Sequence, residues 1–378
     1  MKHVGLLLHY YQPPTQAPEM VRRIDGECYA PSFRLLAETG ARVTVNVNWS
    51  LTEQLADMGS DSLELLGRAK GIEATGSGAY HPILPLIPRR EVERQLKLNS
   101  GGNGDLLGGK FASPRGVFPP EMALDAKTAS LLAELGYGWT VTDDLPWHAS
   151  GREVPARWLP AAGGMAVIMR SNLWSNRVSF HPDDGAATAR ELLKSMDGWN
   201  GGVDCYILLA MDGETFGHHH TGAVEGFLGP FAKALEDAPD GRLSTVSEIV
   251  ESFPLRDTGV VAGSWSTTAD DVRAGVPFPL WDDPANPDHR ALWELVDEVL
   301  QWARECTGQR VASLADRMLY SCPFWWASPG RRSPVQVRRG VAAVLAAALA
   351  ALEETHDVER MDRVMALACA VPAMTGEE

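Results

Sequence analysis

Short apolar runs alternate with amphipathic segments over the first two thirds of the chain. Runs of this kind, bounded by Gly, Pro and Asp, are typical of buried strands. The segments between them are typical of helices, and residues 123–136, for example, carry Leu and Ala at i, i+3 and i+4 spacing and end in a glycine. The pattern predicts strands at residues 3–10, 42–48, 71–78, 115–121, 137–144, 165–171 and 204–214.

Alternating strands and helices predict a parallel sheet. About seven repeats favour a closed barrel over an open doubly wound sheet, and no GxGxxG pattern opens a helix after the first strand. We therefore predict an α/β fold, with a distorted seven-stranded (β/α)7 barrel over residues 1–255. The pattern is purely helical over residues 286–378, which predicts a C-terminal helical domain. Residues 256–285, rich in Pro, Gly, Asp and Ser, are predicted to be a linker that contributes to the active-site cleft.

The composition excludes several classes of partner. The formal net charge is -15 at pH 7 with no basic stripe, and a phosphate backbone would be repelled, so we expect no nucleic acid partner. No run approaches the roughly 20 apolar residues that span a bilayer, so we expect no membrane partner. The first apolar run is too short for a secretory signal, and the cysteines show no CxxC spacing. We therefore expect a cytoplasmic protein with reduced thiols.

Polar side chains follow the predicted strands at the points where they end. In βα barrels the chemistry collects at the carboxyl ends of the strands. Acids, amides and one histidine at these ends would form an acidic pocket, which suits a neutral polyhydroxylated ligand better than an anion. Three prolines in residues 77–88 predict a rigid extended loop, either a purely structural lid or one that also brings Tyr80 and His81 to the pocket. The residues at the strand ends are His9, Asn46, Asn48, Glu73, Glu121, Asp143, Asp144, Asp212 and Glu214.

Two of these carboxylates suggest a reaction. Glu121 by itself is ambiguous, because acids are also common in the first turn of a helix. Asp212 ends the most apolar predicted strand, where burying a carboxylate without a use would be costly. Two carboxylates at the ends of different barrel strands are the minimum apparatus for cleaving a glycosidic bond.

Tryptophan and histidine suggest two kinds of ligand site. Indole faces can stack on the apolar faces of sugar rings, although most tryptophans pack in cores or interfaces. Residues 218–220 are three consecutive histidines, which could bind a metal ion together with His9 and Asp212. Consecutive side chains diverge, however, and the HxxxH and HExxH spacings are missing, so we expect His218 in the pocket and neither a metal nor an organic cofactor. The candidate stacking residues are Trp265, Trp281, Trp325 and Trp326.

Four segments, in order over roughly residues 1–220, resemble the motifs of glycoside hydrolase family 57. The resemblance implies a seven-stranded βα barrel, a helical C-terminal section and activity on α-glucan-type oligo- or polysaccharides. The segments are "LHYYQPP", similar to the first motif His-x-His-Gln-Pro, "GIEATGSGAYHPILPLIP" with Glu73 in the acidic position of the second, "GVFPPEMALD", similar to the third, and "MDGETFG", similar to the fourth.

The resemblance also implies roles. Glu121 takes the position of the nucleophile and Asp212 that of the acid/base in a retaining double displacement, which requires the two carboxyl groups roughly 5 to 5.5 Å apart. We expect Asp212 to be held protonated by burial and by the negative charges of Glu121 and Glu214. The residues expected to hold sugar hydroxyls are His9, Gln12, Glu73, Tyr80, His81, Glu214 and His218.

Two departures from the family pattern lie beside these positions. Tyr11 stands where the family commonly has a histidine before Gln-Pro, and three histidines follow Phe-Gly in the fourth motif where Trp is frequent. Substrate and linkage are therefore expected to differ from those of plain starch.

Three alternatives stay open at the level of sequence. A 4-α-glucanotransferase or branching enzyme would use the same carboxylates and exclude water. A metal-dependent carbohydrate deacetylase would need His and Asp spacings that the sequence lacks. A non-catalytic glycan-binding protein would bind sugars without using Glu121 in any reaction.

Overall fold

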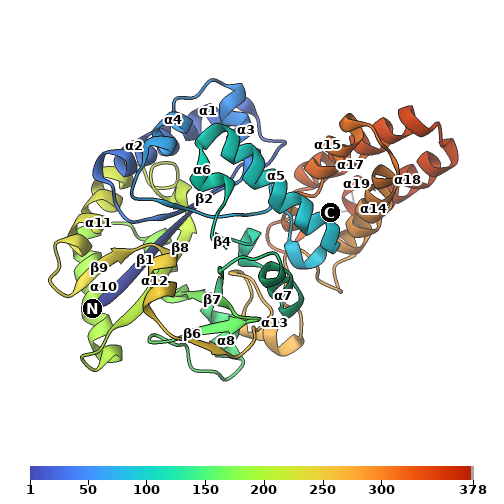
Figure 1. The fold of residues 1–378 in the computed structure, drawn as a ribbon. Helices are drawn as coiled ribbons and strands as arrows, with labels where there is room; N and C mark the ends of the chain where they lie inside the picture. The colour runs from blue at the N-terminus through green and yellow to red at the C-terminus, as the bar shows by residue number, and fades with distance from the viewer. Residues whose placement is uncertain (376–378) are drawn as a thin grey trace.

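The computed structural model describes residues 1–375, and its sheet is centred on β1 (Figure 1). β1 lies parallel to β2 and β8, β3 pairs with β2, and β5 pairs with both β4 and β7. The strands of this ring are β1 (Lys2–Tyr10), β2 (Thr44–Val47), β3 (Glu73–Ala74), β4 (Gly116–Val117), β5 (Trp139–Asp143), β7 (Met165–Arg170) and β8 (Cys205–Asp212).

Two narrow contacts close the ring. Gly76, just beyond β3, bridges to Val117 of β4, and Arg170 of β7 pairs with Leu208 of β8. Each of the seven predicted strands therefore corresponds to one ring strand, and the predicted α/β class with a seven-stranded barrel is confirmed. Three strands beside the ring were not predicted, because three or four residues are too few to show a periodic pattern: β6 (Leu159–Ala162), β9 (Gly241–Ser244) and β10 (Leu255–Asp257).

Both faces of β1 are buried, which explains its continuous apolar sequence. Val4, Leu6 and Leu8 pack with the surrounding helices in one core cluster. Leu7, on the opposite face, packs inside the barrel. His9 shares the face of Leu7 because successive side chains alternate, so the strand carries a polar group into the barrel at its carboxyl end.

Helices cover the ring (Figure 1). Asp125 caps the helix predicted near residues 123–136, because its carboxylate accepts a hydrogen bond from the Thr128 amide at 2.7 Å. The helices around the barrel are α1 (Pro18–Ile24), α2 (Ala30–Thr39), α3 (Trp49–Asp57), α4 (Ser62–Arg68), α5 (Arg89–Leu107), α6 (Gly109–Ala112), α7 (Ala126–Glu134), α8 (Asp144–Ala149), α9 (Asn172–Phe180), α10 (Gly185–Asn200), α11 (Gly229–Glu236), α12 (Val246–Ser252) and α13 (Ala269–Ala274).

The C-terminal helices form a bundle beside α5 and α7 (Figure 1). Val92 and Leu96 of α5 share one apolar core with Val299 and Leu300 of α14, so the bundle packs directly on the barrel. α17 alone among the described helices is long and apolar enough to cross a membrane by length and composition. Residues 376–378 of the predicted helical domain lie outside the described residues. The helices of the bundle are α14 (Pro287–Glu305), α15 (Gln309–Arg317), α16 (Cys322–Ala327), α17 (Pro334–Thr355), α18 (Val358–Ala370) and α19 (Pro372–Thr375).

A largely buried ion network fastens the bundle to the barrel. Arg304 of α14 donates to Glu91 of α5 and to Asp316 of α15, both at 2.7 Å. Arg94 of α5 also donates to Asp316, at 2.6 Å. Because Glu91 is 1% exposed and Arg304 is 12% exposed, losing the cation would leave buried carboxylates poorly compensated.

Arg304→Met is therefore expected to lower the free energy of unfolding by about 3 kcal/mol, measured by urea denaturation at neutral pH. The matched control is Arg310→Met on α15, which removes an exposed ion pair with Glu353 and should cost less than about 1 kcal/mol. Equal losses in the two variants would show that the network does not hold the bundle in place.

Candidate active site

Three neighbouring strands bring polar side chains together at their carboxyl ends. His9 of β1 is paired with Asp212 of β8 on one side and with Asn46 of β2 on the other. Paired residues in a parallel sheet point to the same face, so these three side chains all face into the barrel. Their closeness depends on strand register, which is set when the apolar faces of the strands are buried.

Glu121 reaches the same region from a short helical turn after β4, Pro120–Met122. Its backbone has φ 59° and ψ 15°, in the left-handed region that a non-glycine residue adopts only when its surroundings enforce it. Trp265 supplies that enforcement, because its amide donates to the Glu121 carbonyl at 3.1 Å. The Trp265 indole Nε1 donates to Glu121 Oε2 at 2.7 Å.

Glu121 and Asp212 are close enough to perturb each other electrostatically. Burial, followed by the charge of Asp212, raises the pKa of Glu121 to about 8, and the hydrogen bond from Trp265 opposes the rise. Burial also raises the pKa of Asp212, against the opposing influence of His9 and of the Arg170 guanidinium. Two such carboxyl groups share one proton through neutral pH. Burial and the charge of Asp212 favour the protonated form of Glu121, whereas His9 and Arg170 favour the ionised form of Asp212 against the effect of burial.

The Asp212 side chain is partly exposed. Within residues 1–375 no hydrogen-bond donor contacts its carboxylate, and its charged neighbours are His9 and Arg170. A carboxyl group without a protein partner can exchange a proton with a ligand. This distinguishes Asp212 from Glu121, which already accepts a bond from Trp265.

Two histidines lie between the strands and the carboxylates. His9 Nδ1 is 2.6 Å from Asn46 Oδ1, and His9 Nε2 is 3.1 Å from His81 Nε2. His81 Nδ1 lies 3.9 Å from Glu121 Oε1. Burial lowers the pKa of both imidazoles, so both are neutral at pH 7.

Glu214 forms a second layer behind Asp212. Tyr29 donates to Glu214 Oε1 at 2.6 Å, and the Gln12 amide lies 3.4 Å from the same oxygen. Burial and the Asp212 charge raise the pKa of Glu214 to about 8. The residue between the two acids must be glycine, because a Cβ on Gly213 would lie 2.0 Å from the Tyr10 ring.

Arg170 is a site residue that the sequence analysis missed. It ends β7, is buried, and donates to Asp143 at 2.8 Å. Its guanidinium also lies over the Trp265 ring, 5.5 Å from the centroid. A charged residue at the end of the predicted strand 165–171 was the available signal, but only the ring of strands shows that this end faces Asp212.

Two predicted sugar ligands lie elsewhere. Glu73 begins β3 instead of ending it, so its carboxylate faces the amino-terminal end of the barrel and accepts bonds from Ser247 and Thr44. The Tyr80 hydroxyl donates to Glu53 at 3.2 Å in a cluster with Arg317. The structure does not bring either side chain into contact with the carboxylate pair.

The remaining aromatic and histidine candidates differ in exposure. Trp281 is fully buried, so neither face of its indole is exposed in this structure. Trp325 and Trp326 are half-buried on α16 and meet edge to face at 4.6 Å. His218 Nδ1 lies 2.7 Å from Glu27 Oε2, which places this ring against the turn that follows α1 and not against the carboxylate pair.

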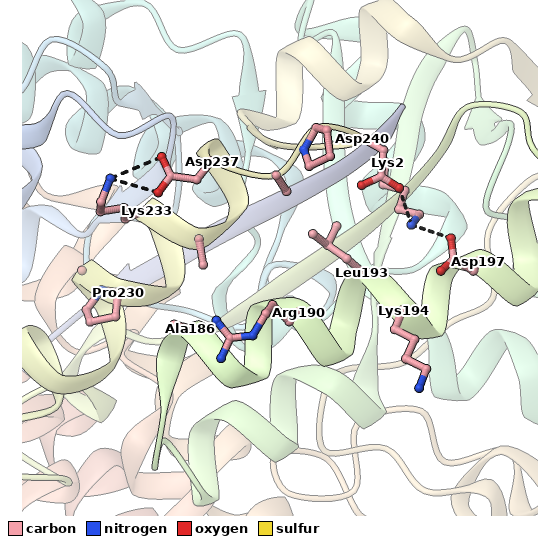
Figure 2. Close-up of a pocket in the computed structure, with 14 residues that line it drawn as sticks. Lys2, Ala186, Arg190, Leu193, Lys194, Asp197, Pro230, Lys233, Asp237 and Asp240 are labelled. Atoms are coloured by element: carbon pink, nitrogen blue, oxygen red, sulfur yellow. Dashed lines mark hydrogen bonds and ion pairs between the residues drawn. The ribbon is translucent and has the colours of Figure 1, made fainter.

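No group of three or more His, Cys, Asp or Glu side chains within residues 1–375 is arranged to hold a metal ion. A separate hollow lies between α10 and α11 at the amino-terminal end of β1, where Lys2 pairs with Asp197 (Figure 2). It contains none of the candidate site residues. The candidate site is therefore the cluster of buried carboxyl groups at the carboxyl ends of the strands, at the opposite end of the barrel.

Comparison with solved structures shows a shared fold. The structure of a 4-alpha-glucanotransferase from Thermococcus litoralis matches with a TM-score of 0.74 at 18% identity, covering 91% of this chain and 59% of that one. A family 57 branching enzyme from Thermococcus kodakaraensis matches with a TM-score of 0.72 at 14% identity, covering 100% of this chain and 97% of that one.

Comparison of sequences identifies the family. A curated alpha-amylase from Pyrococcus horikoshii is 25% identical over 169 residues, which is 43% of this chain and 26% of that protein. The chain thus aligns with about a quarter of the amylase and 59% of the glucanotransferase. The model of glycosyl hydrolase family 57 matches residues 7–262. Because this match covers more than half of the chain, the protein belongs to glycosyl hydrolase family 57.

Proposed function

We propose that this protein is a retaining glycoside hydrolase that acts on α-glucan-type oligo- or polysaccharides through a glycosyl-enzyme intermediate. The observation that carries the proposal is the desolvated, electrostatically coupled pair Glu121 and Asp212 at the ends of separate strands. Membership of glycosyl hydrolase family 57 supports it, as do the amylase, glucanotransferase and branching enzyme among the similar proteins.

The first step uses both carboxyl groups. Ionised Glu121 attacks the anomeric carbon and forms a glycosyl ester, while the glycosidic bond breaks and its oxygen takes the proton of Asp212. In the second step Asp212 accepts a proton from water or from an acceptor hydroxyl, whose oxygen attacks the anomeric carbon and releases Glu121. The same pair therefore serves hydrolysis and transfer, depending on the acceptor.

The shared proton has to be on Asp212 when the bond breaks. A glycosidic oxygen placed against the open Asp212 carboxyl gives that proton an acceptor, and the Trp265 bond stabilises the ionised form of Glu121. Sugar binding is thus coupled to transfer of the proton from Glu121 to Asp212.

The surrounding groups suit a neutral polyhydroxylated ligand. His9, His81 and Gln12 are buried and uncharged, so these three groups offer no counter-charge for an ionic ligand. Trp325 and Trp326 are the half-buried aromatic faces available for stacking beyond the pocket.

Asp212→Asn is expected to lower kcat/KM by about 10²- to 10⁴-fold, because it removes the proton donor. Glu121→Gln should cause a loss of at least that order, because no glycosyl ester can form. Activity is measured on maltooligosaccharides, where reducing-end release indicates hydrolysis and disproportionated chains indicate transfer. NMR of the first product should show a retained α-anomer.

Glu225→Gln is the matched control for these substitutions. Glu225 is an exposed acid that follows the segment carrying Asp212 and Glu214 and does not contact the pair. It should keep wild-type rates. Full activity of both Glu121→Gln and Asp212→Asn would refute the proposed function, and an inverted anomer would refute the double displacement.

A second prediction concerns pH. The active form keeps one proton on the carboxyl pair, so kcat/KM should fall as the pH rises through the pKa of about 8 at Glu121. Trp265→Phe removes a hydrogen bond that favours ionised Glu121, so it should raise the pKa of Glu121. The alkaline limb of the profile, where kcat/KM falls, should then move to higher pH by about one unit. The profile is measured as kcat/KM against pH.

Trp158→Phe, beside β6, serves as the control for loss of an indole and should leave the limb in place. A limb that stays fixed or moves to lower pH in Trp265→Phe would show that Glu121 does not set it.

A further inference from the structure

A segment of the C-terminal bundle enters the candidate active site just before α16. The Ser321 amide donates to the His81 carbonyl at 3.2 Å, and the Ser321 hydroxyl lies 2.9 Å from His81 Nδ1. The next residue, Cys322, has its sulfur 3.5 Å from the Tyr11 hydroxyl. Ser321 is 2% exposed, so solvent does not compete for its hydroxyl. The bundle therefore holds His81 at both backbone and side chain.

A stacked aromatic ring also holds the His81 imidazole in place. Tyr11 stacks on it with ring centroids 4.0 Å apart and planes at 11°. The His81 backbone has φ 59°, in the left-handed region, which persists only where neighbours enforce it. Tyr11 is one of the two departures from the family motif, and its ring now has a defined place against His81. The imidazole cannot turn without losing these contacts, so each ring nitrogen faces a fixed partner.

A chain of hydrogen bonds runs from Asn46 through the two histidines to Ser321, and the positions of its protons follow from the Asn46 end. The Asn46 carboxamide donates to Thr75 at 2.9 Å, which leaves its oxygen to accept from His9 Nδ1–H. A neutral His9 then has a bare Nε2, which accepts from His81 Nε2–H. A neutral His81 therefore has a bare Nδ1, and the Ser321 hydroxyl donates to it.

This tautomer matters for the nearby carboxylate. His81 Nδ1 is 3.9 Å from Glu121 Oε1, beyond hydrogen-bond distance, so a proton on that nitrogen would turn toward the proposed nucleophile only if the Ser321 hydroxyl did not occupy it. A carboxylate that accepts such a bond is stabilised in the ionised form and is a weaker nucleophile. The Ser321 hydroxyl keeps the nitrogen free of a proton.

We propose that Ser321 is a positioning residue by which the C-terminal bundle fixes His81 as its Nε2–H tautomer and keeps its Nδ1 from hydrogen bonding to Glu121. The consequence for catalysis rests on the proposed role of Glu121 as nucleophile, whereas the tautomer itself does not. The groups around His81 that can titrate are His9 on β1, Tyr11, Glu121 and Cys322, and Arg331 acts on Glu121.

Burial favours the neutral forms of the groups around His81. It lowers the pKa of His9 and His81 and raises the pKa of Tyr11 well above its usual value, and the Cys322 thiol has its pKa raised to about 12. Near neutral pH, therefore, only Glu121 among the groups facing His81 changes its protonation.

The test is ¹⁵N–¹H NMR of the full chain labelled in its histidine rings at pH 7, with His81 and His9 assigned by His81→Gln and His9→Asn. In the wild type we expect a protonated Nε2 and bare Nδ1 at His81, and a protonated Nδ1 at His9. In Ser321→Ala the His81 proton should move to Nδ1, and Ser321→Thr should restore the wild-type pattern. Ser328→Ala, at the other end of α16, is the matched control and should change nothing at His81.

An imidazolium or an Nδ1–H tautomer at His81 in the wild type would overturn the proposal without any variant. An unchanged His81 tautomer in Ser321→Ala would overturn it as well. Neither result depends on glycosidase activity, so a failure here is distinguishable from a failure of the proposed function.

Kinetics give a second readout. A new bond from Nδ1–H favours ionised Glu121, so Ser321→Ala should lower kcat and move the alkaline limb of kcat/KM downward by about one unit. KM should change less than kcat, and the shift is opposite to that expected for Trp265→Phe. A purely structural serine would alter neither the limb nor the tautomer, and that outcome would overturn the proposal.

Discussion

Two carboxyl groups in a desolvated space cannot both be ionised at low cost, and the chemistry of this protein depends on that constraint. Burial raises the pKa of Glu121 and of Asp212, and the charge of Asp212 raises the pKa of Glu121 further. The pair therefore keeps one proton near neutral pH, which is the protonation state that one nucleophile and one acid require. Arg170 stabilises the ionised form of Asp212, and Trp265 stabilises the ionised form of Glu121.

The backbone maintains this constraint at some conformational cost. Glu121 and His81 both occupy the left-handed region, and each is held there by a hydrogen bond from a segment far along the chain. Trp265 comes from the stretch after the barrel, and Ser321 comes from the C-terminal bundle. The barrel thus supplies the acids, and the later segments fix the geometry around them.

The charges around the carboxyl pair add a point that the family motifs do not contain. In the proposed mechanism the proton belongs on Asp212, yet His9 and Arg170 favour the ionised form of Asp212, and burial together with the Asp212 charge favours a proton on Glu121. In the proposed mechanism, a proton that moves to Asp212 when the sugar binds would link recognition of the glycosidic oxygen to activation of Glu121.

The sequence by itself determined the seven ring strands, the acids at the ends of β4 and β8, and the helical character of the C-terminal region. These features follow from local patterns, because apolar runs, proline loops and short motifs each report on a few neighbouring residues. The sequence could not decide the direction in which Glu73 faces, since a two-residue strand has no periodicity and only the pairing Thr44–Glu73 places it at the amino-terminal end. It could not separate the buried Trp281 from the accessible Trp325, because an indole suits a core and a sugar equally well. Arg170 over Trp265 and Ser321 against His81 were decided by tertiary structure alone, because contacts between residues more than ninety positions apart depend on how strands and helices pack and leave no local pattern.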